Sequence, residues 1–504
     1  MRKKFFTLIT FLAVLICSVI VIGCSVSAVD VREDPAEEFI KINGAKYSTS
    51  LTKLDLSSEY LTNENIKELG KMVNLTELNL SGNRITDITA LGGLTGLTYL
   101  DLSGNEISDI SPLRGLTELN RLNLRSMLIS DIKPLAGLKK LTFLDLTDNE
   151  ISDISALEGL TGLTELHLGS NKIADINSLS GHENLTFLDL SCNEINDISA
   201  LRGLSELNEL DLHGILISDI KPIARLTNLS CLDLSYIGIG DIKPLAGLTK
   251  LTYLDLSHNK TDDISALKKL TGLTSLNISF NSIRNIGALE NMTSMTLLSL
   301  ENNEIRDINA LKKMTKLEEL SAYRNKIKDI RPLKNLKNLN YIDLDENQIS
   351  DISPLRGLTK LDSLCLGHNR IKNITPLKNI KNLTQLVLKE NRIADISALK
   401  GLENLKNLDL SYNQIKDITA LGSLIALEEL SLRNNNASDL GAIKGLDSLY
   451  YLSLDISQTD DISIFENLNN LKYLTLSDLP DREVKDEDID RLGKVLPDDC
   501  DIYS

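Results

Sequence analysis

Tryptophan is absent from the 504-residue chain, and all aromatic residues together make up only 4% of it. A core built from large rings is therefore excluded, and the 42% of hydrophobic residues must be mainly leucine and isoleucine. Aliphatic side chains of one kind suit identical layers that stack along one axis. The chain length then indicates how many layers there are, rather than how many globular domains.

Cysteine is also scarce, and its spacing argues against a disulfide framework. Two of the six cysteines lie near the N-terminus, and the other four are scattered at positions 192, 231, 365 and 500. Cys192 and Cys231 fall two repeats apart, about 10 Å at ordinary strand spacing, which is too far for a bridge.

The chain has no residues at the spacing of a nucleophile site, a phosphate-binding loop or a set of metal ligands. We therefore predict that it is not an enzyme and that it uses no cofactor. The formal net charge of −17 argues against nucleic acid as a partner, because an acidic surface repels phosphates. A basic protein partner fits better, although acidity also serves solubility alone.

Residues 1–23 read as an export signal, with a short basic head followed by an apolar run. The end of this run, Val21 to Cys24 (VIGC), resembles the lipobox of bacterial lipoproteins, in which the cysteine becomes the lipidated first residue. Cys24 is therefore the expected lipidation site of a membrane-anchored lipoprotein at the cell surface. An uncleaved membrane anchor, or cleavage near Ala28 and secretion, are the alternatives.

A pattern of 22 residues repeats without insertion from Leu75 to about Leu476. One clear copy is LTYLDLSGNEISDISPLRGLTE, from Leu97 to Glu118. Two leucines spaced two apart, such as Leu100 and Leu102, point to one face of a short strand. The strands should stack in parallel, with the intervening residues on an opposite, solvent-facing concave surface.

Two columns, one of asparagine and one of proline, explain how each repeat turns. Counting in steps of 22 from Asn83 to Asn435 gives 17 positions, of which 14 are asparagine. A side-chain amide both donates and accepts, so stacked asparagines can satisfy backbone groups where the chain leaves the sheet. Seven of the ten prolines occupy a second column, which predicts a short 3₁₀-like turn on the convex side.

The frame NxIxDIxPLxxL, repeated over about 400 residues, resembles the leucine-rich repeats of internalins and related bacterial surface lipoproteins. The resemblance implies an α/β solenoid, a leucine-rich repeat horseshoe with a parallel concave sheet that binds protein ligands. Internalins often continue into an immunoglobulin-like module and a cell-wall sorting signal, neither of which is recognisable here. Host-cell invasion should therefore not be inferred.

The expected organisation has four parts. After the leader, residues 24–50 form a spacer and N-terminal cap, residues 51–478 form the repeat array, and residues 479–504 form a C-terminal cap. Helical patterns are expected at Asn63 to Met72 in the first repeat and at Asp486 to Leu496 in the terminal cap.

Several columns of the concave surface deserve testing as sites. Four of the five histidines fall on concave positions, at 167, 213, 258 and 368, but no ligand set clusters there, so a metal site is not predicted. Asp189, Asp211, Asp233 and Asp255 occupy one column about 4.8 Å apart, where a cation or a lysine-rich ligand could bind. The alternative is that aspartate simply belongs to the LDLS consensus.

Aromatic residues recur in another concave column, where exposed rings favour use in an interface and cross-strand packing is the alternative. They lie at positions 99, 143, 187, 253, 341, 451 and 473.

The strongest functional signal lies between Leu297 and Glu390. Most repeats have the strand sequence LDLS, but in this stretch the outward residues differ from that consensus. We call the departing residues the varied patch and predict that they bind the ligand, with two tyrosines and an arginine as anchors. Sequence drift is the alternative. The varied patch consists of Glu301, Tyr323, Arg324, Tyr341, Asp345, His368 and Lys389.

The sequence therefore predicts a non-catalytic cell-surface protein that binds another protein through its concave face. The alternative function is binding of cell-wall or other polymeric carbohydrate, for which the aromatic column could supply stacking rings.

Overall fold

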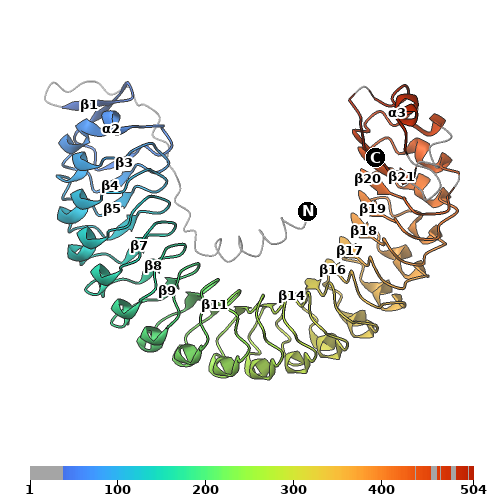
Figure 1. Cartoon of the computed structure of the whole chain (residues 1–504), viewed down its shortest axis with the longest axis horizontal. Helices are drawn as coiled ribbons and strands as arrows, with labels where there is room; N and C mark the ends of the chain where they lie inside the picture. Colours follow the sequence, from blue (N-terminus) through green and yellow to red (C-terminus); the bar gives the residue numbers. More distant parts are fainter. Residues whose placement is uncertain are drawn as a thin grey trace.

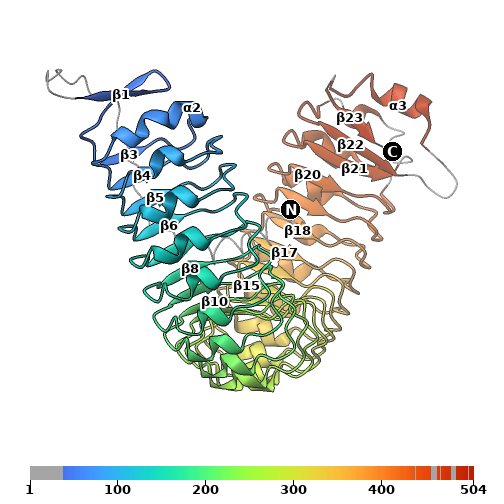
Figure 2. The same cartoon turned by 60° about the vertical axis from the view of Figure 1, so that its left-hand side comes forward.

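The computed structural model describes residues 38–437, 439–455, 462–465, 467–477, 484–497 and 499–503. The chain forms an open arch, with strands along its inner side and short helical turns along its outer side (Figure 1). A view turned by 60° shows the two limbs rising from a common base (Figure 2). The predicted leucine-rich repeat solenoid is confirmed.

The inner side is one parallel sheet in which each strand pairs with the next along the chain. Its 21 strands are β3 (Lys53–Asp55), β4 (Glu77–Asn79), β5 (Tyr99–Asp101), β6 (Arg121–Asn123), β7 (Phe143–Asp145), β8 (Glu165–His167), β9 (Phe187–Asp189), β10 (Glu209–Asp211), β11 (Cys231–Asp233), β12 (Tyr253–Asp255), β13 (Ser275–Asn277), β14 (Leu297–Ser299), β15 (Glu319–Ser321), β16 (Tyr341–Asp343), β17 (Ser363–Cys365), β18 (Gln385–Val387), β19 (Asn407–Asp409), β20 (Glu429–Ser431), β21 (Tyr451–Asp455), β22 (Tyr473–Ser477) and β23 (Asp501–Tyr503).

The pairing register places equivalent residues of successive repeats side by side. Leu210 of β10 faces Leu232 of β11, and Asp211 faces Asp233. Because the period is 22 without insertion, each leucine column is buried as a continuous core and each outward column continues along the concave surface.

The outer side carries one short 3₁₀ helix per repeat, as the proline column predicts. Asp109 shows why this helix begins where it does, since its carboxylate accepts the Ser111 N–H at 2.8 Å, and this bond lowers the pKa of Asp109. The 3₁₀ helices span Lys67–Lys71, Thr89–Leu91, Ser111–Gly115, Lys133–Gly137, Ser155–Leu157, Asn177–Leu179, Ser199–Gly203, Lys221–Arg225, Lys243–Gly247, Ser265–Lys269, Gly287–Leu289, Asn309–Lys313, Arg331–Asn335, Ser353–Gly357, Thr375–Asn379, Ser397–Leu399, Thr419–Ser423, Gly441–Gly445 and Ile462–Phe465.

The asparagine column joins each repeat to the one before it. Asn149 accepts the Ile129 N–H at 3.0 Å and donates from Nδ2 to the carbonyls of Leu124, at 2.9 Å, and Leu146, at 3.0 Å. The first two partners belong to the preceding repeat and the third to its own. The predicted structural role of this column is confirmed.

The two ends of the array differ from the repeats. An antiparallel hairpin of β1 (Phe39–Ile42) and β2 (Ala45–Ser48) precedes the sheet, and the first repeat contains the helix α2 (Asn63–Ile66). At the other end, helix α3 (Asp486–Leu492) ends four residues earlier than predicted. Beyond it, β23 adds a final strand to the sheet in a segment where only a cap was expected.

Cys24 and the rest of the leader lie outside the described residues. Within the described part of the chain, no helix is both long and apolar enough to cross a membrane, and the four cysteines there form no disulfide with one another.

His182 interrupts the leucine core. It occupies the column of Leu160 and Leu204 and is fully buried. Neither ring nitrogen makes a hydrogen bond of ordinary geometry among the described residues, although the backbone of Leu157 and Leu179 lies nearby. Burial lowers the pKa of His182, because the apolar surroundings disfavour the charged ring. The ring therefore stays neutral in the fold and leaves polar atoms unsatisfied.

We predict that His182→Leu raises the free energy of unfolding by about 1–3 kcal/mol at pH 7. The gain should grow at pH 5. A histidine whose pKa is lowered by folding takes up a proton on unfolding once the pH drops below about 6.5, so acid destabilises the wild type and not the leucine variant at this position. Denaturant unfolding at both pH values measures this. Leu204→His, the reverse change one repeat later, should destabilise, and a gain in His182→Leu that is independent of pH would contradict the explanation.

Candidate ligand-binding surface

The concave surface consists of outward columns that alternate with the buried leucines. In β5 and the residues after it, Tyr99, Asp101 and Ser103 are half-buried between neighbouring repeats, whereas Leu100 and Leu102 are fully buried. The predicted strand polarity is therefore correct.

A further outward column follows the strands, at the residue immediately before each asparagine position, and we call it the turn column. Its non-glycine members all have a left-handed backbone, with φ between +48° and +59°. His258 and His368, which the sequence pattern assigned to the concave strands, lie in this turn column instead. Its non-glycine members from Ser126 onward are Ser126, Asp148, Ser170, Cys192, Tyr236, His258, Phe280, Asn302, Arg324, Glu346, His368, Glu390, Tyr412 and Asn434.

Two anchors of the varied patch hold the same carboxylate in the next repeat. The Tyr323 hydroxyl donates to Glu346 Oε1 at 2.6 Å, and Arg324 Nε lies 3.8 Å from Glu346 Oε2. Glu346 was not among the predicted site residues, although it occupies the same turn column as Arg324. These contacts preorganise Tyr323 and Arg324 at the surface, where Arg324 is exposed.

The other members of the varied patch are also paired with neighbouring repeats. Glu301 accepts a hydrogen bond from Ser321 Oγ at 2.6 Å, and His368 Nδ1 lies 2.9 Å from Glu390 Oε2. The Lys389 stem lies over Gly367, where a Cβ atom would come within 3.0 Å of Lys389 Cγ. The patch thus spans the repeats of β14 to β18 as a series of contacts from one repeat to the next.

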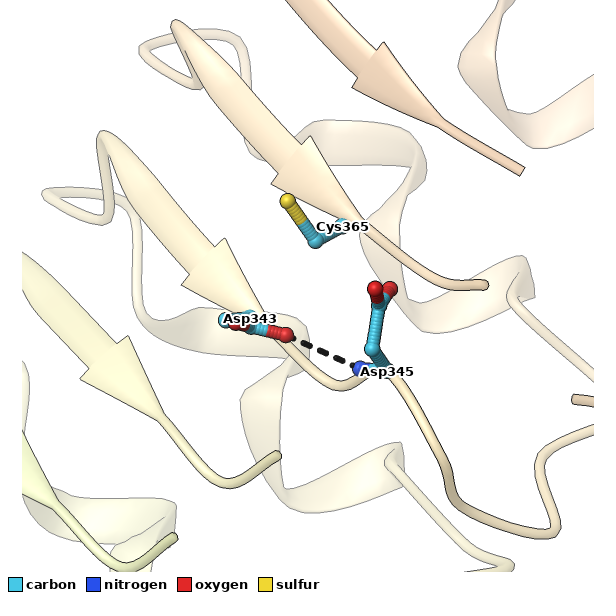
Figure 3. A group of neighbouring side chains, drawn as sticks. All are labelled: Asp343, Asp345 and Cys365. Carbon is cyan, nitrogen blue, oxygen red and sulfur yellow. Dashed lines mark hydrogen bonds between the residues drawn. The ribbon is translucent and has the colours of Figure 1, made fainter. Parts of the chain in front are cut away.

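Asp345 lies with Asp343 and Cys365 between β16 and β17 (Figure 3). One ligand atom from each residue lies within 4.8 Å of the others, and a mixture of carboxylates and thiol fits Zn²⁺ best among common ions. Both carboxylates also bond to backbone, since Asp343 accepts the Asp345 N–H at 3.0 Å and Asp345 accepts the Gly367 N–H at 2.5 Å. The second of these bonds joins the chain after β16 to the chain after β17.

Tyr341 lies next to this group and, like Tyr323, is half-buried, whereas Arg324 is exposed. Burial, together with the neighbouring Asp343 and Cys365, raises the pKa of the Tyr341 hydroxyl. The strand register brings Cys365 opposite Asp343, so Cys365, which was not predicted as a site residue, borders the varied patch.

Two rings of the predicted aromatic column, Phe143 and Phe187, pack on a histidine from the neighbouring column. On β7 to β9 the His167 ring lies between Phe143 and Phe187, with centroids 5.5 and 4.4 Å apart, and the Arg121 guanidinium lies 4.1 Å from the Phe143 centroid. Both of the alternatives for this column, exposure and cross-strand packing, therefore apply to the same rings.

The acidic column on β9 to β12 is in register, so Asp189, Asp211, Asp233 and Asp255 follow one another directly. Burial is the largest influence on the last three and, with the neighbouring carboxylates, raises their pKa values, well above the usual range for Asp211 and to about 7 for Asp255. The predicted alignment of these aspartates in one column is therefore present in the fold.

Comparison with known families identifies the class of protein. The family described as leucine-rich repeats (2 copies) matches residues 73–115, 95–137, 117–159, 139–181, 227–269, 271–313, 315–357, 359–401 and 403–448, and a second leucine-rich repeat family matches 161–217. The chain belongs to the leucine-rich repeat family. Proteins built from these repeats are generally non-catalytic.

Among solved structures, an internalin (InlF) of Listeria monocytogenes is 33% identical, with 68% of this chain and 89% of that chain covered and a TM-score of 0.47. A leucine-rich repeat protein of Leptospira interrogans is 23% identical, with coverage of 90% and 96% and a TM-score of 0.52. The Arabidopsis receptor kinase HAESA, in complex with the peptide hormone IDA and the co-receptor SERK1, is 22% identical, with coverage of 85% and 82% and a TM-score of 0.64. A comparison with curated proteins finds no similar sequence.

The raised pKa values predict how stability changes with pH. An aspartate whose pKa is raised by folding holds its proton in the native state at pH values where the unfolded chain has lost it. Its contribution to the free energy of unfolding therefore falls as the pH rises from about 4 through the folded pKa. Asp211→Asn removes this penalty and can keep the bond that Asp211 accepts from the His213 N–H at 2.8 Å.

We therefore predict that Asp211→Asn is more stable than the wild type at pH 8, by about 1.4 kcal/mol for each unit by which folding raises the pKa of Asp211, and equal to it near pH 4. Asp409→Asn is the matched control, because Asp409 occupies the same column but lies between Val387 and Ser431. Thermal unfolding from pH 4 to pH 8 compares them. Equal behaviour of both variants would show that repulsion between carboxylates is not the cause.

Proposed function

We propose that this chain is a cell-surface protein, held outside the membrane by a lipid on Cys24, that binds another protein through its concave face and catalyses no reaction. The ligand-binding residues are those of the varied patch. The observation that carries this proposal is that the outward residues depart from the repeat consensus from β14 to β18, while the buried columns stay apolar. Folding requires only the buried columns, so a ligand is the constraint that explains the outward ones.

The geometry of the patch supports recognition of a protein surface. Tyrosine and arginine dominate the binding energy of many interfaces, and contacts with Glu346 hold Tyr323 and Arg324 in place before a partner arrives. Carboxylates, an amine and an imidazole surround them, as in the polar rim of an interface. The related structure of HAESA with a peptide hormone supports the same use of this fold.

We predict that Tyr323→Ala combined with Arg324→Asn reduces capture of the partner by at least about tenfold without lowering the melting temperature. Asparagine is chosen at position 324 because it tolerates the left-handed backbone there, where φ is +53°. The measurement is capture of surface proteins by the full chain, identified by mass spectrometry, with a glycan array in parallel.

The control is Thr147→Ala combined with Asp148→Asn, which changes the same two columns outside the patch. Partner capture that survives in the Tyr323 and Arg324 variant would show that the ligand binds elsewhere. Binding to polysaccharide but not to proteins would favour the carbohydrate alternative.

The proposed lipid anchor on Cys24 is tested separately. Cells that express the full chain with a labelled fatty acid should incorporate the label into the wild-type protein and not into Cys24→Ser, because the thiol is the site of lipidation. Ser25→Ala is the neighbouring control. Labelling that persists in Cys24→Ser would contradict the lipoprotein assignment and leave the binding function untouched.

A further inference from the structure

Four aromatic rings form a continuous row at the C-terminal ends of strands β10 to β13, and we call this row the ring stack. Tyr236, His258 and Phe280 follow one another in the turn column, with centroids 3.9 and 4.0 Å apart and planes within 13° of parallel. The His213 ring meets Tyr236 edge-on at 5.3 Å. Tyr236 is 47% exposed, so the row borders solvent.

The ring stack lies beside the acidic column of β9 to β12. His213 Nδ1 lies 2.7 Å from Ser235 Oγ, and Ser235 Oγ donates to Asp233 at 2.6 Å, which links a ring directly to a carboxylate. The same repeats therefore present an edge of aromatic rings and, next to it, a column of carboxylates, of which Asp189, Asp211 and Asp233 are half-buried and Asp255 is buried. Neither feature belongs to the varied patch.

The acidic column has no cationic counterpart within the described residues. No lysine or arginine there lies within 4.0 Å of the carboxylates of Asp189, Asp211, Asp233 or Asp255, although Glu304 pairs with both Arg284 and Lys326 elsewhere on the surface. Four successive carboxylates about 4.8 Å apart repel one another, and each would gain from a cation placed over the column.

Other rings of the chain show what completes such a site. In the turn column itself, the Arg433 guanidinium lies over Tyr412 at 5.5 Å, and at the start of the array Arg84 lies over Tyr60 at 5.4 Å. Phe280 ends the ring stack and, among the described residues, stacks with a ring on one face only. Phe280 is half-buried, and Asn302 is the next residue of the turn column after it.

We propose that the ring stack and the acidic column together bind an extended basic segment of a partner protein. Its arginine and lysine stems pack along the ring edges, where Tyr236 is exposed, and the charged ends lie over the carboxylates. The four repeats span about 15 Å, so the segment in contact is about five residues long in an extended conformation. The net charge of −17 favours its approach.

This site lies outside the varied patch and does not depend on the function proposed for it. The probe is a fluorescent eight-residue peptide of alternating arginine and serine, with a glutamate and serine peptide as the negative control. Fluorescence anisotropy with the full chain should show binding of the basic peptide at about 50 mM salt that weakens at about 300 mM, because surface charge attraction is screened. The acidic peptide should not bind.

Asp211→Asn with Asp233→Asn should weaken binding of the basic peptide by about tenfold or more. The control, Asp101→Asn with Asp409→Asn, changes the net charge equally in the same column of other repeats and should change the affinity less than about twofold. Both pairs use an isosteric amide. An equal loss in both pairs would show only general attraction to an acidic protein and would overturn the proposal.

The ring stack is tested separately by Tyr236→Ser with His258→Ser, since serine already occupies this column at Ser126 and Ser170. We expect a loss of several-fold, whereas Tyr412→Ser outside the site should have no effect. If the Tyr236 and His258 variant binds the basic peptide as tightly as the wild type, the rings are not part of the binding site. The Tyr323 and Arg324 variant should bind the peptide normally, so failure of one proposal is distinguishable from failure of the other.

Discussion

The hydrogen bonds of the asparagine column are the constraint on which the rest of the structure depends. Each amide satisfies backbone groups of two successive repeats at the point where the chain leaves the sheet, as Asn149 does. An insertion would move the amide away from these partners and leave buried backbone groups unsatisfied. The constant period follows from this requirement. Where asparagine is missing, Met127, Ile215 and Ile237 fill the buried position instead.

Because the period is constant, a residue type that recurs at one position of successive repeats forms a row along the sheet. Leucine in a buried position becomes a continuous core, which is stabilising, but aspartate in an outward position becomes a line of like charges. The same stacking therefore supplies both the stability of the array and the strain of the acidic column. At Asn277 the row ends with an amide that donates to Asp255 at 2.8 Å, so the line of carboxylates is terminated by a neutral partner.

Much of the fold could be predicted because strand positions, the buried leucines and the turn asparagines all follow one spacing. The varied patch was found because its outward residues depart from the repeat consensus at an unchanged spacing, but the neighbours that its residues contact were not predicted. Glu346 and Cys365 become neighbours of the patch only through register and side-chain direction. The ring stack was missed for a related reason: His258 was read as a strand residue, whereas the chain has already turned when it reaches that position. The 22-residue spacing of Tyr236, His258 and Phe280 was the available signal.

The left-handed backbone of the turn column limits how this protein can diversify. Seventeen successive repeats, from Gly82 to Asn434, use glycine, serine, cysteine, asparagine, aspartate, glutamate, arginine, histidine, tyrosine and phenylalanine there, and never valine, isoleucine, threonine or proline. A branched Cβ would clash with the backbone at positive φ, and the proline ring fixes φ at a negative value. The residue types available for binding new partners through the turn column are therefore restricted by the backbone conformation. They are mainly polar and aromatic, independently of the ligand.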